Sequence, residues 1–162
     1  MHPLEMLQLI VLLALANSAP IIAKKVFGRR FSYPLDGGIT LFDQRPLFGP
    51  SKTVRGLLSS ILVTTAGALV VGVQPEIGAF VASAAMAGDL FSSFVKRRLN
   101  LLPSSQAIGL DQVPESLLPL LACRDVLSLT AGDITFGVAV FFVGELILSR
   151  VLYAIHLRDE PY

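Results

Sequence analysis

Polar side chains recur at helical spacing within an otherwise apolar stretch near the middle of the sequence. They occupy positions i, i+3, i+4 and i+7, which places them on one face of an α-helix: Asp89, Ser92, Ser93 and Lys96. If Lys96 marks a membrane boundary, Asp89 lies about 10 Å inside it, at ~1.5 Å per residue. A carboxylate at that depth costs about 2.5 to 3.5 kcal/mol on insertion scales, so it needs a cation or a wet cavity. The pattern predicts a functional site, with an interhelical salt bridge or cap as the alternative.

Small residues fill the turns that precede this polar face: Ala82, Ser83, Ala84, Ala85, Ala87 and Gly88. Side chains of this size let a neighbouring helix approach closely within a membrane. We therefore expect a second helix to pack here and to separate a polar cavity from lipid.

A second polar cluster occupies residues 27–54, a stretch rich in glycine turns, carboxylates and cations. It contains Asp36-Gly37-Gly38, Asp43, Arg45, Gly49-Pro50 and Lys52-Thr53-Val54-Arg55. Ser51-Lys52-Thr53 does not predict a nucleotide-binding P-loop, because no glycine directly precedes the lysine and no strand leads into it. By composition alone, a substrate site and a solvated basic loop facing anionic headgroups are both open interpretations.

A third polar segment is Leu110-Asp111-Gln112. An isolated loop aspartate is more often a turn former than a metal ligand, so this segment alone predicts little.

Cysteine and histidine are too scarce to supply the common catalytic sets. The chain has one cysteine, Cys123, and two histidines, His2 and His156. This excludes a disulfide or a Cys/His zinc set within one chain, and it disfavours a Ser-His-Asp relay. Acidic residues and cations must therefore carry any catalysis.

The elements that must position these groups are transmembrane helices. Apolar residues make up 53% of the 162 residues and charged residues 15%, against about 25% charged in soluble domains, and the mean hydropathy is +0.68. Four apolar stretches approach the ~20 residues that cross ~30 Å of hydrocarbon: 4–27, 57–73, 77–95 and 134–155. Residues 117–130 carry Arg124 and Asp125, so a fifth helix is expected to tilt, start earlier or be sheltered by its neighbours. The expected fold class is an all-α integral membrane protein of about five transmembrane helices.

Lysine and arginine are distributed unevenly between the predicted loops. They gather in residues 27–54 and 96–116, whereas three segments on the other side contain none: 1–4, 74–76 and 131–133. Since cytoplasmic loops retain these cations, we predict cytoplasmic basic loops, an outside N-terminus and a cytoplasmic C-terminus. A cleaved signal peptide is disfavoured, because Lys24 and Lys25 follow the first apolar stretch instead of preceding it. The expected protein is one multi-pass domain of the cell membrane, residues 1–162.

In this order, the polar blocks resemble those of the CDP-archaeol synthase family, which is related to the phosphatidate cytidylyltransferases. The similar blocks cover about residues 17–118: Asn17-Ser18-Ala19-Pro20, Pro34-Leu35-Asp36-Gly37-Gly38, Lys52-Thr53-Val54-Arg55-Gly56, Gly88-Asp89, Ser93-Phe94-Val95-Lys96-Arg97-Arg98 and Leu110-Asp111-Gln112. The block that begins at Ser93 also resembles the opening of the wider cytidylyltransferase signature.

The resemblance implies transfer of CMP from CTP to the phosphate of a membrane lipid of archaetidic or phosphatidic acid type, with release of pyrophosphate. It implies Mg²⁺ as cofactor, Asp89 and Asp111 as its ligands, and Lys52 and Lys96 as further catalytic residues. The residues expected to bind CTP or lipid are Asn17, Asp36, Lys52, Thr53, Arg55, Ser93, Lys96 and Arg97. Whether Lys52 and Arg55 contact the triphosphate or the lipid phosphate stays open. A phosphate monoester loses its second proton near pH ~6, so the reaction needs no histidine base.

Several polar residues have structural interpretations. Pro20 cannot donate to the carbonyl of Ala16, so a kink is expected near Asn17 and Ser18, which either offers their polar groups to the cavity or is purely structural. Arg98 points away from the Asp89 face and is expected to anchor the helix end in headgroups. For the mid-depth charges we expect interhelical pairs such as Arg124 with Glu145.

Two other classes of function remain open at this level. A small transporter subunit would use ionisable residues to mark a path through the bilayer, but no matched pair of broken helices is evident. A non-catalytic membrane scaffold leaves the Asp89 face unexplained. No nucleic-acid partner is expected, and so few spans allow a homodimer that completes the cavity walls.

Overall fold

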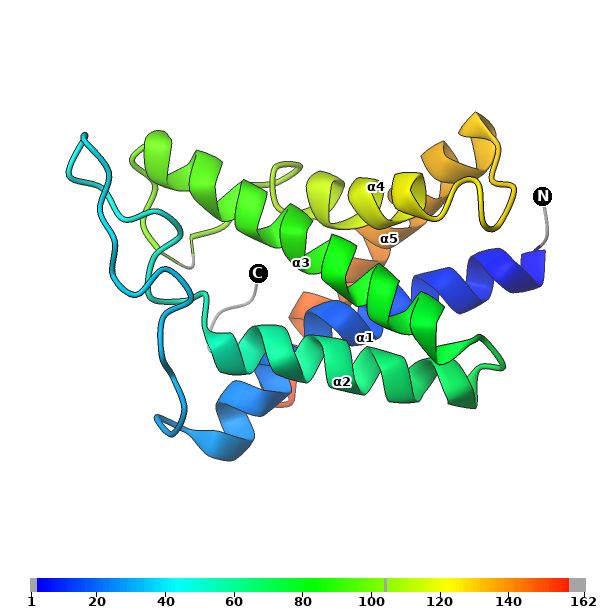
Figure 1. Ribbon diagram of the computed structural model, residues 1–162, viewed down its shortest axis with the longest axis horizontal. Helices are drawn as coiled ribbons and strands as arrows, with labels where there is room; N and C mark the ends of the chain where they lie inside the picture. The colour runs from blue at the N-terminus through cyan, green and yellow to red at the C-terminus, as the bar shows by residue number, and fades with distance from the viewer. Residues whose placement is uncertain (1–2, 104, 158–162) are drawn as a thin grey trace.

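Five α-helices make up most of the described chain (Figure 1). The computed structural model describes residues 3–103 and 105–157, and the helices in it are α1 (Pro3–Phe27), α2 (Val54–Val70), α3 (Pro75–Arg98), α4 (Gln112–Ala122) and α5 (Ala131–Ala154). Those residues contain no β-strand and only two isolated bridges, both within the loop between α1 and α2. The predicted all-α class is confirmed.

Three of these helices are long and apolar enough to cross a membrane. α1, α3 and α5 have 24 or 25 residues and mean hydropathies of 1.4 to 2.0, and α2 is an apolar helix of 17 residues. α4 has 11 residues and is therefore about 16 Å long. It begins earlier than the predicted stretch and ends before Arg124, which lies in an exposed turn with Asp125. The chain is a multi-pass membrane protein.

The two loops that carry the polar sequence blocks lie at the same end of the bundle (Figure 1). They are the α1–α2 loop (residues 28–53) and the α3–α4 loop (residues 99–111), while the N-terminus and the turns that follow α2 and α4 lie at the other end. The second loop is shorter than the predicted 96–116, because α3 continues to Arg98 and α4 begins at Gln112.

The core forms around α1, which contacts α2, α3 and α5. Its fully buried side chains include Leu12 and Leu13, which join small residues of α3 and Leu120 of α4 in one cluster. α3 and α4 meet at Gly88, where an added Cβ would lie 2.3 Å from the carbonyl oxygen of Pro114. The small residues before Asp89 therefore admit another helix, as predicted.

Pro20 leaves one backbone carbonyl of α1 without its usual helical donor, and a side chain of α2 donates to it instead. Pro20 has no N–H for the carbonyl of Ala16, and the hydroxyl of Ser60 on α2 donates to that oxygen at 2.8 Å. Both Ala16 and Ser60 are fully buried. The break predicted in the α1 hydrogen-bond pattern thus binds two helices together, which an apolar environment favours.

The α1–α2 loop is held in shape by the carboxylate of Asp36. One oxygen accepts from the backbone N–H of Gly38 at 3.0 Å, and the other accepts from those of Phe48 and Gly49 at 2.9 Å each. Burial alone would raise the pKa of Asp36, but these N–H groups outweigh it and lower the pKa below its usual value. A buried carboxylate therefore organises a loop that has little regular structure.

The contact at Gly88 predicts a sharp difference between two glycines. Gly88→Ala should destabilise the protein by about 1 to 3 kcal/mol, because the new Cβ meets backbone atoms of α4 and forces the helices apart. Gly144→Ala is the matched control on α5, where a Cβ meets nothing within 4 Å, and alanine favours a helix by about 0.5 to 1 kcal/mol. Thermal unfolding in one detergent measures both. Equal melting temperatures would contradict the packing described for α3 and α4.

The lowered pKa of Asp36 predicts how its contribution to stability depends on pH. The folded pKa lies below the unfolded value of about 3.9, so the contribution is fully present above about pH 5 and is lost as pH falls through the folded pKa. The difference in free energy of unfolding between the native chain and Asp36→Asn should therefore be constant from about pH 8 to about pH 5 and shrink in stronger acid. Unfolding curves of both proteins across this range measure it. A difference that widens on acidification would show that Asp36 is not held by these N–H groups.

Candidate active site

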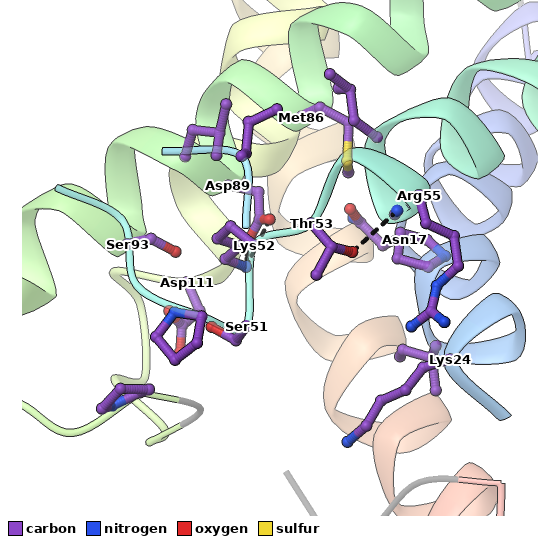
Figure 2. A pocket seen from close by; sticks show the side chains of 18 of the residues that line it. Asn17, Lys24, Ser51, Lys52, Thr53, Arg55, Met86, Asp89, Ser93 and Asp111 are labelled. Carbon is purple, nitrogen blue, oxygen red and sulfur yellow. Dashed lines mark hydrogen bonds and ion pairs between the residues drawn. The ribbon is translucent and has the colours of Figure 1, made fainter. Parts of the chain in front are cut away.

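A polar cavity of about 890 Å³ opens at the end of the bundle that carries the α1–α2 and α3–α4 loops. All five helices and both of these loops contribute to its wall. Figure 2 shows Lys52, Asp89, Ser93 and Asp111 gathered in one part of it, with Asn17, Arg55 and Lys24 beyond Thr53. The groups come from distant parts of the sequence, so the fold brings them together.

Lys52 and Asp89 form an ion pair in the wall of the cavity. The Lys52 Nζ lies 2.5 Å from Oδ1 of Asp89 and 2.6 Å from Oδ2, and the two side chains are 23% and 19% exposed. Burial alone would lower the pKa of Lys52, but the charges of Asp89, Glu115 and Asp111 outweigh it and raise the pKa. The cation predicted to compensate Asp89 comes from the α1–α2 loop.

A second pair joins α3 to the α3–α4 loop. The Lys96 Nζ lies 2.7 Å from Oδ1 of Asp111 and donates to the carbonyl of Ser105 at 2.9 Å. The other Asp111 oxygen accepts from the N–H of Ala107 at 2.8 Å. The two predicted metal ligands thus line one cavity, and each carries a lysine partner.

The polar side chains that were predicted to share one face of α3 have two different roles. Ser93 is buried in the cavity wall beside Asp89 and Lys96. Ser92 instead donates to the carbonyls of Gly88 and Leu110, at 2.9 Å and 2.6 Å. Ser92 therefore holds the start of α4 against α3 and leaves Ser93 as the cavity-facing hydroxyl.

The adjacent arginines at the end of α3 differ in environment. Arg97 lines the cavity, is 4% exposed and donates from Nη2 to the carbonyl of Leu102 at 2.8 Å. Its Nε and Nη1 are buried and have no hydrogen-bond partner in the described part of the chain. Buried donors of this kind are suited to an anionic ligand.

Arg98 points away from the cavity, as the spacing predicted, and it contacts the α1–α2 loop. Its anchoring in headgroups stays a prediction. Arg98 lies 2.7 Å from Asp43 and donates to the carbonyl of Pro46 at 2.6 Å. Arg98 therefore fastens the far part of the α1–α2 loop to α3.

Four further candidate residues from the sequence differ in their access to the cavity. Asn17 lines it, and its buried Nδ2 has no partner among the described residues. Thr53 lines it and caps α2 by accepting from the N–H of Gly56 at 3.1 Å. Arg55 lines it too, with Nη1 donating to the carbonyls of Gly28 and Arg30. Asp36 is not among the lining residues.

One acidic residue of the cavity escaped the sequence analysis, and another was assigned to the wrong partner. Glu115 on α4 is 7% exposed and lies within hydrogen-bonding reach of Asp89, one helical turn after Asp111. Glu145 on α5 also lines the cavity. The predicted pair of Arg124 with Glu145 was wrong, because Arg124 lies in the turn before α5, some 20 Å along the helix axis from Glu145. The signal available was Glu145 itself, since an acidic residue within an apolar span is functional by default.

The donor set suits a hard cation that shares its ligands with a substrate. In residues 3–103 and 105–157, no group of three or more His, Cys, Asp or Glu side chains could hold a metal by itself. Two carboxylates, Asp89 and Asp111, do line one cavity together with the buried donors of Arg97 that have no partner among the described residues. Mg²⁺ is commonly bound by one or two carboxylates with water and phosphate oxygens, so these residues fit it.

Comparison with known proteins gives the family. Residues 4–162 match the CarS-like family, described as CDP-archaeol synthase. The CDP-archaeol synthase of Thermococcus onnurineus is 39% identical over 132 residues, covering 75% of this chain and 74% of that protein. That of Pyrococcus furiosus is 39% identical over 123 residues, covering 69% and 70%.

A solved structure shares the fold as well. It is described as an intramembrane enzyme for archaeal membrane lipid biosynthesis, and it matches with a TM-score of 0.77 and 29% identity over 90% of this chain and 92% of that chain. Sequence blocks, helical architecture and near full-length similarity agree, and the chain belongs to the CDP-archaeol synthase family.

Proposed function

We propose that this protein transfers CMP from CTP to the phosphate of a membrane-embedded ether lipid, forming a CDP-lipid and pyrophosphate. The observation that carries the proposal is the cavity in which two lysine–carboxylate pairs, Lys52–Asp89 and Lys96–Asp111, meet at one end of an apolar bundle. Relatives of the chain are CDP-archaeol synthases, which supports an archaeol-type lipid as the acceptor.

The proposed reaction is a displacement at the α-phosphorus of CTP. An oxygen of the lipid phosphate forms a bond to that phosphorus, and the bond to the oxygen bridging the α- and β-phosphates breaks and releases pyrophosphate. At neutral pH the lipid phosphate is largely a dianion, with a second pKa of about 6, so it attacks without a base. The protein must therefore align two anions and offset their repulsion.

The cations of the cavity suit that task. We assign Lys96, Arg97 and the Ser93 hydroxyl to the triphosphate, because Arg97 has buried donors without partners and Lys96 lies beside it. Lys52 would lie between the two substrates, since it is fixed at Asp89 and separates Ser93 from Asn17 and Arg55 in Figure 2.

Asn17, Thr53 and Arg55 line the α1–α2 side, and we assign them to the lipid phosphate. In kinetic assays, Arg55→Ala should raise the KM for lipid and leave the KM for CTP unchanged. The reverse result would assign Arg55 to the nucleotide.

Asp89 and Asp111 would hold Mg²⁺ together with phosphate oxygens. When bound, the ion supplies positive charge that offsets the triphosphate and keeps its oxygens in line. Lys52 and Lys96, which neutralise these carboxylates in the structure, would then donate to phosphate oxygens instead. Both pairs are complete within one chain, so this chemistry does not require the homodimer considered from the sequence.

The reaction and its metal are tested together with labelled CTP, archaeal ether-lipid phosphate or phosphatidic acid, and a titration of Mg²⁺. The native protein should form a CDP-lipid. Asp89→Asn and Asp111→Asn should lose the activity or need far more Mg²⁺, because each removes a carboxylate charge. Asp43→Asn, which alters the exposed pair with Arg98, is the control and should keep the native Mg²⁺ dependence.

Melting curves of the same variants separate a metal ligand from a structural partner. If Asp89 only stabilises the fold, Asp89→Asn strands the Lys52 charge, lowers the melting temperature and leaves the Mg²⁺ response intact. A folded native protein that is inactive with every lipid phosphate would remove the proposed function altogether.

We also propose that the cavity faces the cytoplasm, where CTP is available. The support is that the cationic α1–α2 loop and the basic last turn of α3 share one end of the bundle, while the turns after α2 and α4 contain no Lys or Arg except Arg124. In a Cys123→Ser background, Gln74→Cys should react with an impermeant thiol reagent on intact cells, and Ile108→Cys should react only after permeabilisation. Both positions are exposed, so accessibility within the fold does not bias the comparison. The opposite labelling would place the cavity on the wrong side for CTP.

A further inference from the structure

We propose that Asp36, which lies outside the cavity, is a positioning residue that fixes Lys52 for the reaction. This inference rests on the proposed function, because its catalytic consequence is expressed through CMP transfer. It replaces the direct contact with substrate that the sequence predicted for Asp36.

A closed set of hydrogen bonds connects the two residues. Asp36 accepts from the N–H of Gly49 at 2.9 Å, and the carbonyl of Gly49 accepts from the N–H of Lys52 at 3.2 Å. The carbonyl of Lys52 in turn accepts from the N–H of Leu35, the neighbour of Asp36, at 2.7 Å. The backbone of Lys52 is thus held on both sides by the segment that carries Asp36.

Asp36 has the properties of an organising group and lacks those of a ligand. It is 5% exposed and absent from the cavity wall, and no lysine or arginine among the described residues pairs with it. Both of its oxygens accept from backbone N–H groups of its own loop, those of Gly38, Phe48 and Gly49. Three orphaned donors would remain if the carboxylate were removed, so the loop depends on it.

Lys52 requires such support because it enters the cavity from a loop. A lysine side chain has about 2 kcal/mol of rotamer entropy, and a loop with little regular structure adds backbone freedom. The site needs the ammonium at one point, between Asp89 and the place assigned to phosphate. Asp36 supplies a fixed backbone from which the side chain can reach that point.

The same segment also covers Arg97. Gly49 has a φ of +95°, a conformation that glycine adopts readily, and a Cβ built there would lie 3.7 Å from Cδ of Arg97. By holding the N–H of Gly49, Asp36 keeps the chain against the arginine as well as next to Lys52. The Asp36 carboxylate therefore helps to position both Lys52 and Arg97, two of the cations assigned to the substrates.

The test is a double-mutant cycle on the rate of CMP transfer, with Asp36→Ala, Lys52→Ala and the combined variant. Asp36→Ala alone should lower kcat roughly tenfold to a hundredfold, as the loss of a charge-assisted contact does, with a smaller effect on the KM for CTP. Once Lys52 is alanine, Asp36→Ala should lower kcat little further. Asp36→Asn keeps an oxygen acceptor and should recover part of the rate.

Asp43→Ala is the matched control, because it removes a carboxylate from the same loop without touching the hydrogen bonds around Lys52. In the variant that combines Asp43→Ala with Lys52→Ala, the fold-decrease in kcat should equal the product of the two single effects. Full activity of Asp36→Ala, or losses that multiply in the Asp36 and Lys52 cycle, would overturn the inference.

A second measurement does not depend on activity. Trypsin should cleave after Lys52 faster in folded Asp36→Ala than in the native chain or in Asp43→Ala, with the melting temperature confirming that each variant is folded. Unchanged cleavage would overturn the positioning role. If the native chain has no CMP transfer with any lipid but Asp36→Ala loosens the loop, the proposed function fails and the link between Asp36 and Lys52 stands.

Discussion

The requirement that a charge in a low-dielectric interior be compensated determines how this protein is built. The residues that directly precede Asp89 in α3 are small or apolar and cannot neutralise its charge. The neutralising cation is Lys52, which lies 37 positions earlier in the chain. For the two to meet, the α1–α2 loop must fold back into the end of the bundle, and α3 must turn one face inward. α4 then closes the cavity by packing backbone against backbone at Gly88.

Local spacing predicted those parts of the site that lie on one helix. The positions of Asp89, Ser93 and Lys96 follow from a period of 3.6 residues, and membrane insertion makes a carboxylate among small residues conspicuous. Pro20 likewise predicted a free carbonyl, although its partner, Ser60, belongs to another helix and has no recognisable local signal. Apolar stretches of about 20 residues were enough to predict the long helices.

Features that depend on tertiary contacts were beyond the sequence. Glu115 was missed because α4 begins five residues before the predicted apolar stretch, with Pro114 in its first turn, where proline is tolerated. Arg124 was predicted to pair with a residue of another helix, but it lies in an exposed turn away from that residue. The role of Asp36 is carried by bonds to backbone N–H groups, which any residue except proline provides, so no sequence pattern indicates them.

The bond between Ser60 and Ala16 makes the effect of a substitution at position 20 or 60 depend on which residue is present at the other position. A serine opposite an ordinary helix is nearly harmless, because its hydroxyl can bond within its own helix. A proline at position 20 without that serine would leave a buried carbonyl with no donor, in a region where lipid offers none. The serine is therefore dispensable when position 20 can donate a backbone N–H, and its loss is harmful when position 20 is proline.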